Sequence, residues 1–293
     1  MSLDRSLQHG PNSTFGATVA TKCLPRFTCG ELLAAVIRIL DGTGARAELV
    51  ASLTTFEAGS DRSRIWSRPK APPRVGMDVN GITVVIEGRD RSAFGSVELA
   101  ELEFRLWPGG EAAISRAWAH VSVSEVSAAG AYDADDNFVR AAAVTAVTAA
   151  VAELTAAVGV VWCTSRCAIP GEQLSGLTGA LVSGEAPTDF WVTVSERQGA
   201  AAATRGLYAL IGAEVEVQSS TLPHATARTV AMEVAKEIIC AGQPPAEDEI
   251  LVYARKTDFR VWYRDGDGTR SVPAVVLSDV TGARGSGFAT GAA

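Results

Sequence analysis

The sequence is poor in the residues and motifs from which most catalytic sites are built. Its 293 residues include only three histidines, and no G-x-S-x-G motif lies between a predicted strand and a predicted helix. The glycine-containing stretches GTGARA (42–47) and GARGSG (282–287) neither follow a strand and open a helix nor carry a Walker lysine. We therefore expect neither an α/β-hydrolase nucleophile nor a nucleotide cofactor.

Positive charge is scarce as well. The chain has 26 lysines and arginines against 33 acidic residues, which gives a formal net charge of −7. Nucleic acid is therefore not expected as a partner, because phosphate binding needs a basic stripe. The nearest approach to one is segment 61–75, where basic residues surround Trp66 (Arg62, Arg64, Arg68, Lys70 and Arg74). Such a run can contact an anion or a partner, but its three prolines favour a solvated loop.

Signals for secretion or membrane insertion are also missing. MSLDRSLQHGPNS has no apolar segment before a small-residue cleavage site, so no secretory signal is predicted. The longest apolar run, 141–162, is rich in alanine and threonine and contains Glu153, which favours a buried helix over a membrane span. Five cysteines, an odd number, favour free thiols in a reducing compartment. Together these features predict a cytoplasmic protein.

The chain does contain clear strand and helix patterns. About half of it (47%) is apolar and 20% is charged, a globular composition. A first β-α-β unit is predicted from strand 15–21, a helix opened by Thr28 or Gly30, and strand 47–53. The second unit consists of strand 119–126, a helix over 137–157 and strand 160–165, and Asp135 or Asp136 caps its helix. Further elements are predicted at strand 81–88, a strand ending at 107, helices 110–117, 170–181 and 225–242, and strands 189–198, 213–218, 249–255, 258–265 and 272–277.

These elements define the expected fold. Strand–helix–strand units mixed with strand pairs predict an α+β fold, with mixed or mainly antiparallel sheets and helices packed on one face. The β-α-β rhythm recurs in both halves, so we expect two closely packed subdomains, residues 15–110 and 111–280. Residues 1–14 are expected to form a flexible lead-in and residues 281–293 a flexible tail.

Four segments carry a resemblance to a known family. They are AWAHVSV (117–123), the capped helix after DDNF, GVVWCTS followed by PGEQL, and RGLYALIGAEVEVQ leading to the helix before DEILVYAR. With these, residues 80–280 resemble a bacterial family of domains of unknown function, family 4261. The stretch QPPAED (243–248) departs from the longer polar turn expected there. The resemblance implies a shared fold and a cytoplasmic bacterial setting, and it transfers no catalytic residue.

His120 is the residue on which an enzymatic hypothesis depends. It alternates with apolar residues on the predicted strand 119–126, with Ser122 and Ser124 on the same face. If the long helix covers that face, the imidazole needs a hydrogen-bond partner, whereas in a groove it is the best ligand contact. A core histidine is the favoured interpretation. The ligand-binding candidates are His120 and the residues expected near it in the sheet (Arg116, Trp118, Trp162 and Cys163).

Metal sites fail tests of spacing. Cys163 and Cys167 span about 13 Å in extended chain, too far for a shared zinc ion or a disulfide unless residues 164–166 turn back. A calcium loop needs glycine at position six and glutamate at position twelve. Counting from Asp133, these positions hold Phe138 and Val144, and the count from Asp265 also fails. No metal is expected.

Because every motif with a mechanism fails its test, we predict a non-catalytic module that binds a small-molecule ligand or a protein partner. The alternative is an enzyme, hydrolase-like or thiol-assisted, assembled around His120 with Arg116 and either Cys163 or Glu125. A groove lined by those residues favours the enzyme or a small ligand. An exposed apolar face or edge strand favours a protein partner.

Overall fold

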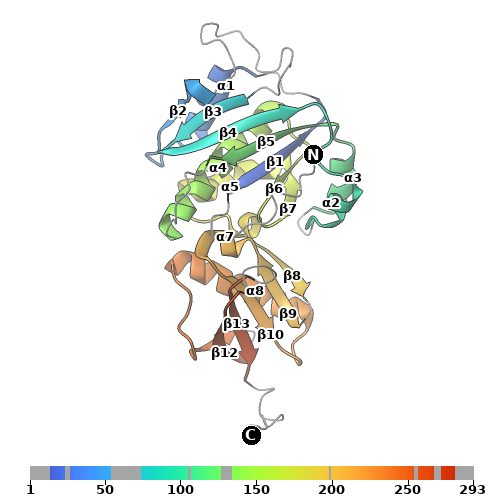
Figure 1. The fold of residues 1–293 in the computed structure, drawn as a ribbon, viewed down its shortest axis with the longest axis vertical. Helices are drawn as coiled ribbons and strands as arrows, with labels where there is room; N and C mark the ends of the chain where they lie inside the picture. Colours follow the sequence, from blue (N-terminus) through green and yellow to red (C-terminus); the bar gives the residue numbers. More distant parts are fainter. Residues whose placement is uncertain are drawn as a thin grey trace. The chain divides into compact units, whose positions relative to one another are not determined.

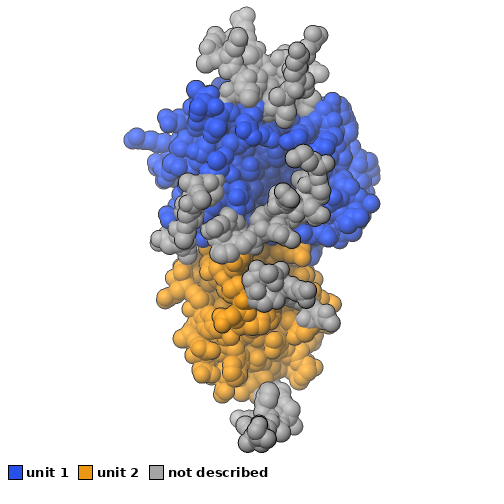
Figure 2. Space-filling model, in the orientation of Figure 1, with its two compact units in different colours: residues 1–191 blue, residues 192–293 orange. Residues whose placement is uncertain are grey.

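The computed structural model divides the chain into unit 1, residues 1–191, and unit 2, residues 192–293 (Figure 2). Each unit is built on one sheet whose strand pairs are mostly antiparallel, so the predicted α+β class is confirmed. The structure describes residues 14–23, 27–53, 74–104, 107–126, 134–197, 199–253, 257–266 and 272–280. The predicted lead-in and tail, and most of the basic segment, lie outside the described residues.

Unit 1 contains a seven-stranded sheet in the order β2-β3-β4-β5-β1-β6-β7 (Figure 1). All of its neighbouring strands pair antiparallel. The interior strand β1 separates β5 from β6, which the sequence suggested as neighbours. The strand bounds are β1 Gly16–Thr21, β2 Ala47–Leu49, β3 Arg74–Val79, β4 Ile82–Arg89, β5 Ala119–Glu125, β6 Gly159–Trp162 and β7 Cys167–Pro170.

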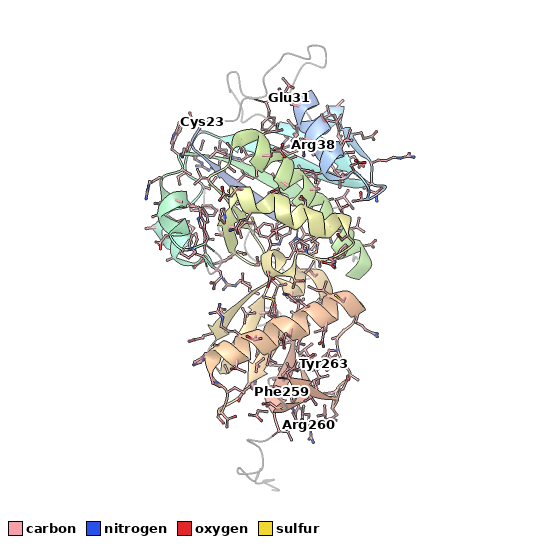
Figure 3. All side chains as sticks on the ribbon, turned by 180° about the vertical axis from the view of Figure 1, so that it is seen from behind. Cys23, Glu31, Arg38, Phe259, Arg260 and Tyr263 are labelled. Carbon is pink, nitrogen blue, oxygen red and sulfur yellow. The ribbon has the colours of Figure 1, made fainter. Side chains whose placement is uncertain are left out.

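Helices lie on both faces of this sheet. α1, α4 and α5 share one face, where α4 packs on β1, β4 and β5 (Figure 3). On the other face, α2 and α3 cover the β6–β7 end over a small apolar cluster that includes Ala20, Leu99 and Ile114. The helix bounds are α1 Cys29–Ile39, α2 Ser96–Ala100, α3 Gly110–Ser115, α4 Ala134–Thr155, α5 Leu174–Val182 and α6 Thr188–Trp191, and short 3₁₀ turns span Ala51–Leu53 and Gly171–Gln173.

The core of unit 1 lies under α4. Trp162 on β6 and Trp191 in α6 are fully buried with their rings stacked, and Trp191 Nε1 donates to Thr145 Oγ1 of α4 at 2.9 Å. Among the described residues, one helical stretch is long and apolar enough to cross a membrane, and it is Asp136–Thr155 of α4. Because 67% of that stretch is buried inside the protein, it serves unit 1 as a core helix.

Unit 2 contains a six-stranded sheet in the order β11-β12-β13-β10-β9-β8. The pair β10–β13 is parallel, and the other pairs are antiparallel. Helix α8 packs on β8, β9 and β10 (Figure 3). The bounds are β8 Thr193–Arg197, β9 Ala200–Arg205, α7 Leu207–Ile211, β10 Glu214–Gln218, α8 His224–Ala241, β11 Ile250–Tyr253, β12 Thr257–Arg264 and β13 Ala274–Asp279.

Several local predictions need correction. The expected boundary at 110/111 falls inside unit 1, because β4 and β5 on either side of it are neighbours in one sheet. The strand expected over 101–107 is not formed in its described part, because α2 ends at Ala100 and residues 101–104 form a turn and one bridge, Glu103 to Cys167. The strand expected over 160–165 ends at Trp162, where the chain turns into β7. β3 was not predicted at all.

Candidate functional site

His120 lies on the face of the sheet opposite α4. Side chains alternate along β5, and Glu125 points to the α4 face, where Arg140 of α4 donates to it. His120 therefore points the other way, beside Ala20 of β1 and Arg89 of β4, its partners in register. Its exposed fraction is 7%. The long helix does not cover this face.

One hydrogen bond fixes the state of the imidazole. His120 Nδ1 lies 2.7 Å from the carbonyl oxygen of Arg91, and since a carbonyl accepts, Nδ1 carries the proton. Burial lowers the pKa of His120, and the charges of Arg91 and Arg89 lower it further, although the bond to Arg91 acts in the opposite direction. His120 is therefore neutral at pH 7 with a single tautomer. This is the satisfied core histidine that the sequence favoured.

The other parts of the enzymatic alternative lie elsewhere. Cys163 sits opposite Gly16 beyond β1, about 13 Å along the strands and about 10 Å across them from His120, so the two are about 16 Å apart. Burial raises the pKa of Cys163 to about 11, against a hydrogen bond from Thr18 that lowers it. A thiol in that state is not a nucleophile at neutral pH. Glu125 is buried on the opposite face and paired with Arg140.

The remaining predicted ligand contacts do not form a groove with His120. Trp162 is fully buried on the α4 face, in the aromatic core of unit 1. Trp118 is 54% exposed, and Arg116, the C-cap of α3, is exposed too. A groove of about 670 Å³ lies between α1, α4 and α5 and is bordered by the exposed ion pair Arg38–Glu153. None of the five predicted ligand-binding residues lines this groove.

The described residues hold no cluster of three or more histidine, cysteine or acidic side chains able to bind a metal ion. The chain does turn back between Cys163 and Cys167, the condition under which these thiols approach each other, and Arg166 in this turn has a positive φ of 58°. Neither thiol forms a disulfide, and neither do the other three cysteines.

The site that the sequence did not reveal is the outer edge of β11. This strand ends the sheet of unit 2, so one side of its backbone has no neighbouring strand among the described residues. Leu251 pairs in register with the buried Phe259 of β12. Ile250 and Val252 point to the other face of the sheet, where their side chains are 46% and 59% exposed. Trp262 on β12, diagonal to Ile250, is 44% exposed. Three large apolar side chains are thus exposed next to an open strand edge.

The ladder between β11 and β12 shows which backbone groups face outward. Val261 N donates to Glu249 O, its partner in register, so this pair is hydrogen-bonded. Hydrogen-bonded and non-bonded pairs alternate along an antiparallel ladder. Leu251 and Tyr253 therefore bond to β12, while the N–H and C=O groups of Ile250 and Val252 point away from it. These outward groups suit the addition of another strand.

The other sheet edges carry features that discourage strand addition. Glu103 bridges the outer side of β7, donating to Arg166 O at 2.9 Å and accepting from Ala168 N at 3.0 Å. β2 has only three residues, and β8 has a register irregularity between Ser195 and Arg197. Short strands, bulges and covering segments are the usual protection of sheet edges. β11 has four residues, shows no bulge and meets no covering segment among the described residues, and its two exposed side chains bear no charge.

No protein-family model, no curated protein and no solved structure matches this chain. The resemblance to family 4261 is therefore neither supported nor contradicted, and it stays a prediction. The evidence on function is the geometry of the two units.

Proposed function

We propose that the protein is a non-catalytic binding module that takes up an extended segment of a partner protein as an added strand at the edge of β11. The observation that carries this proposal is the unprotected edge itself, with Ile250 and Val252 exposed beside outward backbone groups. Strand addition uses such groups for affinity and alternate side chains for specificity. The two N–H and two C=O groups of these residues offer about four hydrogen bonds of about 1 kcal/mol each.

The other candidate functions have less support. The parts of a site around His120 are about 16 Å apart or buried on opposite faces, which argues against the enzymatic alternative. The groove between α1, α4 and α5 has a size suited to a small ligand, but its lining is mainly small apolar residues with an exposed ion pair at the rim. Five cysteines without a disulfide among them support the proposed cytoplasmic setting.

A proline at the edge tests the proposal. Val252→Pro removes an outward N–H without removing a bond to β12, so the sheet of unit 2 is retained. Binders are selected from a display library of random short peptides, and their affinities are measured for the natural protein and the variant. We expect Val252→Pro to weaken binding by about ten-fold or more.

A second edge variant, Val252→Lys, has Val97→Lys as its matched control. Val97 is a 71% exposed valine in α2 of the other unit, so its replacement leaves β11 untouched. Selected peptides that bind Val252→Pro and Val252→Lys as well as the natural protein would overturn the proposal. A library that yields no binder at millimolar protein concentration would overturn it too.

A further inference from the structure

The two sides of β11 differ in charge. The side facing α8 carries an acidic flank, made of exposed carboxylates on α8 and on the loop before β11 (Glu233, Glu237, Glu247 and Glu249). Tyr253 on this side donates a hydrogen bond to Glu237. Burial raises the pKa of Tyr253, and the hydrogen bond and neighbouring carboxylates raise it further. Lys236 on α8 offsets part of this negative charge.

The opposite side of the strand is more apolar, although it also carries two exposed charges of β12, Asp258 and Arg260, the register partners of Val252 and Ile250. Its apolar flank consists of Ile250, Val252 and Trp262. Arg260, labelled in Figure 3, lies over the Trp262 ring, with its guanidinium carbon 6.0 Å from the ring centroid. This cation extends over the aromatic face and does not reach the acidic flank, because side chains alternate between the faces along β12.

A strand added to β11 has to satisfy both flanks. Its side chains alternate in direction, so every second one lies against the acidic flank and the others lie against the apolar flank. We propose that the segment bound at β11 belongs to another protein and alternates basic with apolar residues over a stretch as long as β11. This inference rests on the proposed function and names the chemistry of the partner.

A second copy of this chain fits the described residues less well. Pairing β11 with its own copy brings a second Glu249 and a second Glu237 towards the first acidic flank, where like charges repel. The cations that follow β11 in the sequence, Arg255 and Lys256, lie outside the described residues. Self-association is therefore an outcome that the experiment has to separate.

The test compares three peptides, KVKVKVK, TVTVTVT and EVEVEVE, by fluorescence polarisation with the full chain. We expect KVKVKVK to bind most tightly and to weaken as salt is added, because exposed ion pairs are screened. The double variant Glu237→Gln/Glu249→Gln should lower its affinity about three- to ten-fold, the loss expected for two surface ion pairs. The affinity for TVTVTVT should not change. Glu111→Gln, in α3 of the other unit, is the matched control.

The outcomes separate the inference from the proposed function. If EVEVEVE or TVTVTVT binds as tightly as KVKVKVK, the basic partner is refuted and the strand-adding module stands. If none of the peptides binds, and library selection also yields no binder, the proposed function itself fails. A dimer in native mass spectrometry that Val252→Lys dissociates would replace the partner protein with a second copy.

Discussion

Removing Glu125 should be far more damaging than removing a comparable carboxylate at the surface. Glu125 accepts from Arg140 Nη2 at 2.5 Å and Nε at 2.8 Å, and Oε1 also accepts from Phe15 N at 2.7 Å. The side chains of Glu125 and Arg140 are 2% and 3% exposed. Glu125→Leu therefore removes the carboxylate that pairs with this buried guanidinium and the acceptor of the buried Phe15 N–H.

Breaking a buried pair from one side costs about 3–5 kcal/mol, and an unsatisfied buried N–H about 1 kcal/mol more. We expect Glu125→Leu to lower the free energy of unfolding of unit 1 by about 4–6 kcal/mol, measured by urea unfolding with tryptophan fluorescence. The double variant Glu125→Leu/Arg140→Leu should recover at least half of that loss, because no charge then remains buried.

The matched control is Glu153→Leu. Its partner Arg38 is 59% exposed, so the loss should stay below about 1 kcal/mol. The reasoning is refuted if Glu125→Leu costs as little as this control. It is also refuted if the double variant is as unstable as the sum of the two single variants, since the charges would then not depend on each other.

Three further predictions follow from single sites. Burial lowers the pKa of His120 below 6.5, so its contribution to stability is present above that pH and is lost as the pH falls. The free energy of unfolding of the natural protein relative to His120→Asn should therefore decrease from pH 7.5 to pH 5. A constant difference would contradict this. Cys163 is partly exposed and its pKa is raised to about 11, so it should react with a thiol reagent at pH 8 far more slowly than the exposed cysteines; labelling as fast as theirs in a peptide map would contradict this. Gly171→Ala places a methyl group 2.4 Å from the carbonyl oxygen of Ala157 and should cost about 1–3 kcal/mol in urea unfolding, while Gly176→Ala, with no atom nearby, should not destabilise.

Elements with a strong local pattern were predictable from the sequence. Strand β5 shows strict alternation, and α1 is capped by Thr28, whose side chain accepts from Glu31 N while Glu31 accepts from Thr28 N. β3 was missed, although the sequence contains a signal for it. Asn80 and Gly81, with φ of 54° and 87°, form the tight turn that joins β3 to β4, and an Asn-Gly pair is typical of such hairpins. β7 had no such signal, since the turn before it lacks glycine and depends on contacts with distant residues.

The candidate site was beyond sequence reasoning for a different reason. The strand 249–255 was predicted, but its position at the end of the sheet depends on the order in which six strands associate. Tertiary pairing, not local propensity, decides whether such a strand is central or at an edge. For the same reason the sequence analysis expected His120 near Cys163. Nothing in the local sequence shows that β1 inserts between β5 and β6.

The position of β1 inside the sheet, between β5 and β6, has a consequence for synthesis. The ribosome makes Gly16–Thr21 first of all the described strands, yet its two neighbours end at Glu125 and Trp162. At about 5–20 residues per second, β1 waits roughly 7–28 s for its second partner. Until β5 is made both edges of β1 are unpaired on the nascent chain, and one edge stays unpaired until β6 follows, so a holding chaperone or slow release should improve the yield of folded protein.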